Sequence, residues 1–210
     1  MCGIVGAVAK RDVTPILIKG LQRLEYRGYD SAGIAVHDAG QTQRVRSVGK
    51  VQSLVDAIAH NPVSGVTGIA HTRWATHGEP TSANAHPHLS GERVALVRNG
   101  IIENHATLRN ALKAEGVVFQ SETDTEVIVH LIHSSLTQGE TLFDAVRLTV
   151  AKLEGAYAIA VVDTAHDDEV VVAREGSPLV LGVGIGEMFA GSDTLALRQV
   201  TDTFVYLEDG

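Results

Sequence analysis

The sequence has a single cysteine, Cys2, among its 210 residues. One thiol cannot form an intrachain disulfide, so the fold has to be stabilised by its own core. The chain also lacks any apolar run near the roughly 18 residues that a membrane span needs. It has no run of Lys and Arg of the kind that binds nucleic acids, and its N-terminus has no basic segment of a secretory signal. These absences predict a cytoplasmic protein that binds neither membranes nor nucleic acids.

The composition fits one globular domain over residues 1–210. Hydrophobic residues make up 44% of the sequence, and the formal net charge is -8. A chain of this length buries enough apolar surface to fold alone, and the acidic balance contributes mainly to solubility. Because the chain stops soon after an apolar strand pattern, at Gly210, we expect a domain of a longer protein.

Apolar spacing predicts groups of strands and helices along the chain. The expected strands cover residues 4–9, 32–37, 43–48, 66–71, 94–98, 157–162, 170–173, 179–183, 188–190 and 204–207. The expected helices cover residues 14–26, 51–59, 103–115, 124–136 and 142–153. Many strands are separated only by turns, which indicates an α+β fold of antiparallel sheets with helices on their outer faces. Residues 75–92 have no apolar period, and a loop of this length inside a domain is usually functional.

Cys2 has the position of a self-activated nucleophile. Once Met1 is removed, one residue carries both the thiol and a free α-amine, with ordinary pKa values of about 8.5 and about 7.7–8.0. The amine can then act as the general base for the thiol without a histidine partner. A free cysteine is more often a small buried apolar residue, so the N-terminal MCGI is a weak signal by itself.

Two further segments place polar side chains at expected strand ends. Arg73 presents a planar fork that suits a carboxylate, and Trp74 follows it at the entrance to the long loop. By themselves these two fit a surface ion pair and a core side chain better than a binding site. Asn99 and Gly100 offer a side-chain amide and a backbone N–H for an oxyanion hole. The same pair is the strongest short signal for a hairpin turn, and taken alone the turn is favoured.

Ser121 and Asp124 match a helix-capping pattern, because they stand three residues apart at the expected start of a helix. The carboxylate of Asp124 also suits a substrate ammonium. The two roles are compatible, since capping fixes the carboxylate in place.

Ten histidines offer a competing use of the chain. His86 and His88 flank a proline, and His130 and His133 lie one turn apart on an expected helix. Together with Cys2 they suggest zinc ligands. No CxxC or HExxH spacing is present, however, so the sequence predicts no metal site.

Three longer segments, taken in order, resemble the class II glutamine amidotransferases, a family of N-terminal-nucleophile hydrolases. They are LEYRGYDSAG at residues 24–33, HTRWATHGEP at residues 71–80 and SETDTE at residues 121–126, in a chain that begins MCGIVG. The resemblance spans essentially the whole chain and is strongest to the branch that transfers ammonia to fructose 6-phosphate. It implies a four-layer αββα sandwich of two antiparallel sheets, L-glutamine as substrate and no cofactor.

The resemblance also implies a role for each matching residue. Arg73 binds the α-carboxylate of glutamine and Asp124 binds its α-ammonium, while Asn99 and Gly100 form the oxyanion hole for the Cys2 nucleophile. Other matching residues close over glutamine or surround the site, and they are Trp74, Thr76, His77, Arg27 and Tyr29.

One residue departs from the family pattern. Arg98 stands where the family usually has a histidine, directly before Asn-Gly. Alternation along a strand predicts that its side chain points away from the oxyanion hole. We therefore expect catalysis to be retained and the local charge to be changed.

The resemblance implies that this chain is the ammonia-releasing part of a longer enzyme. Fructose 6-phosphate is then bound only by C-terminal sugar-phosphate isomerase domains that this chain lacks, and the full-length enzyme is expected to be a homo-oligomer. Two alternatives stay open. One is the glutaminase domain of another class II amidotransferase, and the other is a non-catalytic glutamine-sensing domain that keeps the fold.

Overall fold

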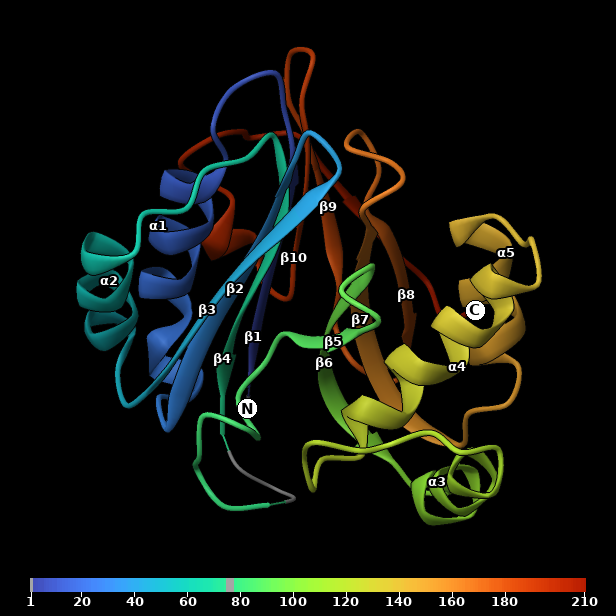
Figure 1. The fold of residues 1–210 in the computed structure, drawn as a ribbon. Helices are drawn as coiled ribbons and strands as arrows, with labels where there is room; N and C mark the ends of the chain where they lie inside the picture. Colours follow the sequence, from blue (N-terminus) through green and yellow to red (C-terminus); the bar gives the residue numbers. More distant parts are fainter. Residues whose placement is uncertain (1, 75–77) are drawn as a thin grey trace.

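The computed structural model describes residues 2–74 and 78–210. Within them, two antiparallel β-sheets stack between two layers of helices (Figure 1). The larger sheet has seven strands in the order β11-β9-β10-β1-β4-β2-β3. Its strands are β1 (Gly3–Val8), β2 (Ser31–Asp38), β3 (Gln41–Val48), β4 (Thr67–Arg73), β9 (Val180–Val183), β10 (Met188–Gly191) and β11 (Phe204–Tyr206).

The smaller sheet has four strands in the order β5-β6-β7-β8 over the same described residues. Its strands are β5 (His88–Ser90), β6 (Val94–Ile102), β7 (Gly155–Asp163) and β8 (Val171–Glu175). Neighbouring strands run antiparallel in both sheets. The prediction of two antiparallel sheets is confirmed.

Helices cover the outer face of each sheet (Figure 1). The larger sheet carries α1 (Thr14–Leu24) and α2 (Val51–His60). The smaller sheet carries α4 (Thr125–Thr137) and α5 (Leu142–Val150), with α3 (His105–Ala114) packed against α4. Apolar residues form one core under each helical layer and a third between the sheets, which makes the four-layer αββα order. Across the described part of the chain, no helix has the length and apolar content to cross a bilayer.

The strand β6 serves two of these cores at once. Leu96 belongs to the core under α4 and α5, whereas Ala95 and Val97 belong to the core between the sheets. Because side chains alternate along a strand, Asn99 faces the larger sheet and Arg98 faces the helical layer. Because of this alternation, the side chains of Asn99 and Arg98 contact different parts of the site described below.

Two expectations about local structure were wrong. Asn99 and Gly100 form no hairpin turn in the described structure, because β6 continues to Ile102 and pairs with β7 over its whole length. Residues 75–92 were expected to be loop throughout, but they include β5. A strand of three residues is too short for an apolar period to appear.

Candidate active site

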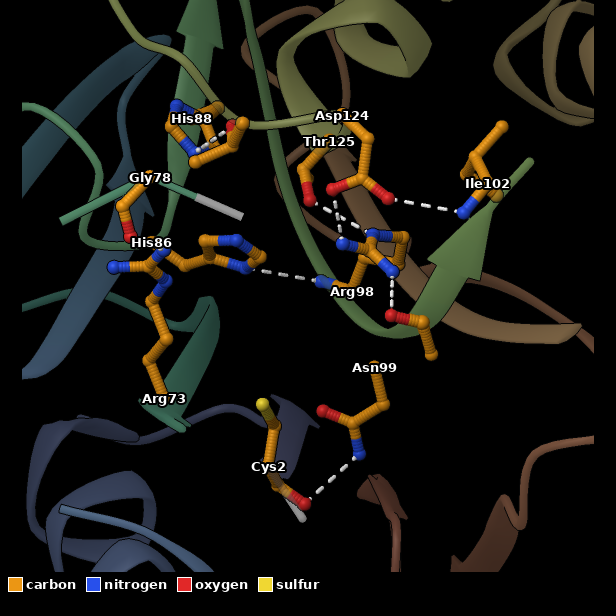
Figure 2. A network of polar contacts seen from close by, with 12 residues as sticks. Cys2, Arg73, Gly78, His86, His88, Arg98, Asn99, Ile102, Asp124 and Thr125 are labelled. Carbon is orange, nitrogen blue, oxygen red and sulfur yellow. Dashed lines mark hydrogen bonds and ion pairs between the residues drawn. The ribbon is translucent and has the colours of Figure 1, made fainter. Parts of the chain in front are cut away.

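Segments far apart in the sequence meet around one cavity (Figure 2). Cys2 directly precedes β1 in the middle of the larger sheet, and Arg73 ends the adjacent strand β4. Asp124 directly precedes α4. The cavity is lined by Cys2, His71, Arg73, Trp74, His86, Arg98, Gly100, Thr123 and Asp124. A second cavity of about 270 Å³ adjoins Cys2 and is lined in part by Asn99.

The thiol of Cys2 is half-buried and has a backbone partner. Its Sγ accepts a hydrogen bond from the N–H of Trp74 at 3.2 Å. Burial raises the pKa of the Cys2 thiol, an effect opposed by the Trp74 N–H and by the positive charge of Arg98. A base is therefore needed to take the thiol proton near neutral pH. Met1, whose removal exposes the α-amine of Cys2, lies outside the described residues.

The side-chain amide of Asn99 is held at both ends. Its Nδ2 donates to the carbonyl oxygen of Cys2 at 3.1 Å (Figure 2), and its Oδ1 lies 3.1 Å from Nε2 of His71. The same Nε2 lies 2.9 Å from the carbonyl oxygen of Arg98. Both neighbours of Nε2 are acceptors, so the proton of the neutral imidazole is on Nε2. His71 thereby determines which way the Asn99 amide faces.

Burial keeps the histidines behind Asn99 neutral. Loss of hydration lowers the pKa of His71 to about 3, and the charge of Arg98 acts in the same direction. The ring of His71 stacks on that of His86 at 4.1 Å between centroids, and burial also lowers the pKa of His86 well below its ordinary value. His86 accepts the backbone N–H of Arg98 on Nδ1 at 3.3 Å (Figure 2). Two neutral rings therefore support the backbone and the amide at residues 98–99.

Gly100 has a backbone that only glycine adopts easily. Its φ is +99°, and a Cβ at this position would collide with the carbonyl oxygen of Ala156 on β7. Glycine next to Asn99 is therefore required by the close pairing of β6 with β7. Gly100 lines both cavities beside Cys2.

Arg73 is buried at the end of β4. Its guanidinium donates to the carbonyl oxygens of Gly78 at 3.0 Å and Glu79 at 3.2 Å, and it lies 3.9 Å from the carboxylate of Asp30. The alternative of a surface ion pair is wrong, because Arg73 is only 4% exposed. The alternative of a core side chain is wrong for Trp74, which is 54% exposed. Arg73 instead presents a buried cation to the cavity.

The carboxylate of Asp124 is paired inside the protein. Its Oδ1 accepts a hydrogen bond from Nη2 of Arg98 at 2.5 Å, and its Oδ2 accepts the backbone N–H of Ile102 at 2.9 Å (Figure 2). Arg98 also donates to Oγ1 of Thr125 at 2.8 Å and to the carbonyl oxygen of Gly100. Its side chain lies on the helical side of β6, as alternation predicts. It nevertheless lines the cavity, because the carboxylate that it binds lies there.

The expected capping pair of Ser121 and Asp124 is wrong. Asp124 is the N-cap residue of α4, but among the described residues its side chain accepts no capping hydrogen bond. Ser121 donates from Oγ to Glu126 at 2.6 Å, and Glu126 also accepts the backbone N–H groups of Gln120 and Ser121 at 2.7 Å each. The carboxylate of Asp124 is hydrogen-bonded to Arg98 and Ile102 instead. The turn before α4 is therefore held by the carboxylate of Glu126.

The remaining predicted residues lie at the rim of the site. The exposed ring of Trp74 meets the ring of Tyr29 edge-on at 6.5 Å between centroids. Arg27 forms an ion pair with Asp193 at 2.8 Å, which ties the segment before β2 to the turn after β10. Trp74 also lines both cavities. Two predicted loop residues lie outside the described residues, Thr76 and His77.

The histidines considered as zinc ligands are engaged with other groups. Within residues 2–74 and 78–210, no three side chains of the His, Cys, Asp or Glu type are grouped so as to bind a metal ion. The rings of His86 and His88 meet edge-to-face at 4.9 Å between centroids. The Nδ1 atoms of His130 and His133 lie 2.9 and 2.8 Å from Oγ of Ser90.

Sequence reasoning missed the contribution of His71. The available signal was a polar ring inside an apolar strand pattern, in the segment GIAHTR. Its function depends on contact with Asn99, which lies 28 positions further along the chain. No local pattern contains that contact.

Known proteins are similar to this chain in sequence. The family model of the glutamine amidotransferase domain matches residues 71–199. The chain is 62% identical to a glutamine–fructose-6-phosphate aminotransferase (isomerizing) of Pseudomonas aeruginosa and 60% identical to that of Shewanella oneidensis, in each case over 100% of this chain. It spans 34% of the length of these curated relatives.

Solved structures show the same architecture. A glutamine phosphoribosylpyrophosphate amidotransferase from B. subtilis matches with a TM-score of 0.87 and 28% identity, over 100% of this chain and 46% of that chain. A glutamine aminotransferase class-II domain protein from Silicibacter pomeroyi matches with a TM-score of 0.61 and 14% identity, over 100% of this chain and 92% of that chain. The second similarity concerns the fold alone.

Proposed function

Because this chain belongs to the glutamine amidotransferase family, we propose that it hydrolyses L-glutamine to L-glutamate and ammonia. The observation that supports this most directly is one cavity that brings together Cys2, Arg73 and Asp124, with Asn99 hydrogen-bonded to the backbone of Cys2. A nucleophile, anchors for an amino acid and an oxyanion donor are what hydrolysis of a side-chain amide requires.

The reaction begins at Cys2 after removal of Met1. The α-amine of Cys2 takes the thiol proton, and the sulfur attacks the carboxamide carbon of glutamine. The carboxamide oxygen becomes an anion, which Nδ2 of Asn99 and the N–H of Gly100 stabilise. Asn99 is suited to this task, because its Nδ2 already donates a hydrogen bond to the backbone carbonyl oxygen of Cys2 and so lies beside the nucleophilic residue.

The tetrahedral intermediate then loses ammonia. The C–N bond breaks as the protonated α-amine of Cys2 returns its proton to the leaving nitrogen, and a γ-glutamyl thioester remains. Water, deprotonated by the same amine, attacks the thioester carbon. The C–S bond breaks, glutamate leaves and the thiol is regenerated.

The substrate is held by charged groups at its other end. The guanidinium of Arg73 offers a fork to the α-carboxylate, and the carboxylate of Asp124 offers a partner to the α-ammonium. Both side chains are buried, so these contacts are stronger than the same contacts in water.

We also propose that residues 1–210 are the glutaminase domain of a glutamine–fructose-6-phosphate aminotransferase, also called glucosamine-6-phosphate synthase. In such a protein fructose 6-phosphate binds outside residues 1–210. The second cavity beside Cys2 is lined by Trp74, Ile101 and Pro178 among others, and this mainly apolar lining suits the passage of neutral ammonia. Homo-oligomeric assembly and the cytoplasmic location of the full-length protein stay predictions.

A glutaminase assay combined with intact-mass measurement tests the proposal. The mass shows whether Met1 has been removed and whether an electrophilic glutamine analogue adds once, at Cys2. We expect the processed protein to release glutamate and ammonia in equal amounts, and we expect no release from Cys2→Ser or from protein that retains Met1. Turnover by the Met1-retaining form contradicts the role of the α-amine. A folded, processed chain without turnover contradicts the proposed function.

A further inference from the structure

The carboxylate that should receive the α-ammonium of glutamine is occupied by a cation of the protein itself. The two oxygens of Asp124 accept hydrogen bonds from Arg98 at 2.5 Å and from the N–H of Ile102 at 2.9 Å (Figure 2). Asp124 is fully buried, and the side chain of Arg98 is 5% exposed. Both oxygens of the carboxylate therefore have a partner inside the protein before an ammonium arrives.

Arg98 is anchored by more than this ion pair. Its guanidinium also donates to Oγ1 of Thr125 at 2.8 Å and to the carbonyl oxygen of Gly100. The group thus joins the start of α4 to β6. A planar guanidinium that satisfies three acceptors at once competes strongly with a ligand cation for the same carboxylate.

Each guanidinium that lines the cavity has a carboxylate beside it before any substrate binds. Arg98 pairs with Asp124, and the guanidinium of Arg73 lies 3.9 Å from the carboxylate of Asp30. The α-carboxylate of glutamine brings one negative charge. The α-ammonium adds a third positive charge beside Arg98, which is unfavourable as long as Arg98 keeps its place.

The free space beside Asp124 is small. The cavity lined by Arg98 and Asp124 has a volume of about 10 Å³, which is room for roughly one water molecule, whereas the adjoining cavity beside Cys2 has about 270 Å³. An α-ammonium next to Asp124 therefore requires a side chain to move. Release of Arg98 from Asp124 makes space and frees the carboxylate in a single step.

We propose that Arg98 is a specificity-determining residue, whose guanidinium the α-ammonium of the substrate has to displace from Asp124. The inference rests on the proposed function, because it concerns the same substrate. Its consequence is weak selection for the α-ammonium. The chain should hydrolyse glutaramate, which is glutamine without the α-amino group, with an efficiency close to that for L-glutamine.

The test compares kcat/KM for L-glutamine and for glutaramate in the processed wild-type chain and in Arg98→His and Arg98→Gln. In the wild type we expect the preference for glutamine to stay within about tenfold. In both variants we expect the preference to grow by about tenfold or more, mainly through a lower KM for glutamine. The reason is that the ammonium then becomes the partner of Asp124, whereas glutaramate leaves that carboxylate buried without a cation.

Two control variants separate this effect from a general disturbance. Arg98→Lys keeps a positive charge near Asp124, so its preference should remain near that of the wild type. Arg93→Gln removes the guanidinium that pairs with buried Asp163 at 2.9 Å, outside the cavity. Its preference should also match that of the wild type. The thermal unfolding curve of each variant checks that the protein is folded at the temperature of the kinetic assay.

A binding measurement on the wild type decides the question without any variant and without turnover. Calorimetry with L-glutamate and with glutarate should give Kd values within about tenfold of each other. A preference of about a hundredfold for L-glutamate overturns the proposal, and so does an unchanged substrate preference in both Arg98→His and Arg98→Gln. If neither ligand binds, this inference fails, whereas the proposed function is judged by the release of glutamate and ammonia. If both bind but the processed chain releases no ammonia, only the proposed function fails.

Discussion

The two ends of the candidate glutamine site are built from different kinds of group. Around Cys2 the supporting groups are neutral, namely the amide of Asn99 and the imidazole of His71, whose pKa is lowered to about 3 by burial. Around Asp124 the supporting group is charged, because Arg98 forms a buried ion pair with it. One end has its hydrogen bonds in place before substrate arrives, while the other has to exchange an internal partner for the substrate.

This difference teaches how the two ends contribute. Fixed neutral donors cost little reorganisation during reaction, so they act on the transition state. A buried ion pair contributes little net stability, yet breaking it by removal of one partner is costly. We therefore expect substitutions at the Cys2 end to lower kcat, and substitutions at the Asp124 end to change KM and the free energy of unfolding.

Cys2→Ala is the most severe change at the neutral end. We expect turnover to fall by about a million-fold, or below detection, because the nucleophile itself is removed. Binding of L-glutamine, measured by calorimetry, should persist, since Arg73 and Asp124 are intact. Loss of binding together with turnover contradicts the division between the two ends.

Asp124→Asn tests the charged end. The substitution leaves Arg98 buried without a carboxylate, so the free energy of unfolding should fall by about 3–5 kcal/mol in denaturant titrations. In the protein that remains folded, KM for glutamine should rise with little change in kcat. The double variant Arg98→Gln/Asp124→Asn buries no unpaired charge and should recover much of the lost stability. If the double variant is as unstable as Asp124→Asn alone, the loss of stability does not come from the unpaired charge of Arg98.

Asn99→Ala removes one oxyanion donor at the neutral end. We expect kcat to fall by about a hundredfold to a thousandfold, which corresponds to about 2.7–4 kcal/mol, with KM nearly unchanged. Asn110→Ala, on the exposed surface of α3, is the matched control and should behave as the wild type. A change in KM alone places Asn99 in binding rather than in transition-state stabilisation.

The smallest predicted effect is a pH dependence of stability. His71 is neutral in the folded chain down to about pH 3, whereas in the unfolded chain it takes up a proton below about pH 6.5. The unfolded state therefore binds more protons in this window, and the free energy of unfolding falls as the pH falls, by at most about 1.4 kcal/mol per pH unit for this group. His71→Gln should reduce that slope between pH 6 and pH 4. Equal slopes in the wild type and His71→Gln contradict the lowered pKa.

Most of the fold was predictable from local patterns. Residues 14–26 have the apolar spacing of a helix, and α1 occupies most of that range with Ile16, Leu17, Leu21 and Leu24 buried. The strand pairs on either side of short turns follow from alternation, as for β2 and β3. The exception at Asn99 and Gly100 is instructive. Asn-Gly is a local signal for a turn. In the structure the two residues stay extended instead, because the strand that contains them, β6, is hydrogen-bonded to β7 along its whole length.

The candidate site was predictable only in part. Cys2, Arg73 and Asp124 were identified as single residues with suitable chemistry, and the structure brings them to one cavity. The partners of these residues were not predictable. His71 reaches Asn99 across 28 positions, and Arg98 reaches Asp124 across 26.

The sequence by itself determined that a lone cysteine stands directly after Met1, and that strands and helices follow one another in an order that two sheets and two helical layers can satisfy. Those properties depend on the chemistry of each residue and on the period of its neighbours. Only the tertiary structure decided that a neutral His71 orients Asn99 and that Arg98 occupies the carboxylate of Asp124. The physical reason is that hydrogen bonds and ion pairs depend on distance and burial in space, and these are created only when β4, β6 and the start of α4 come together.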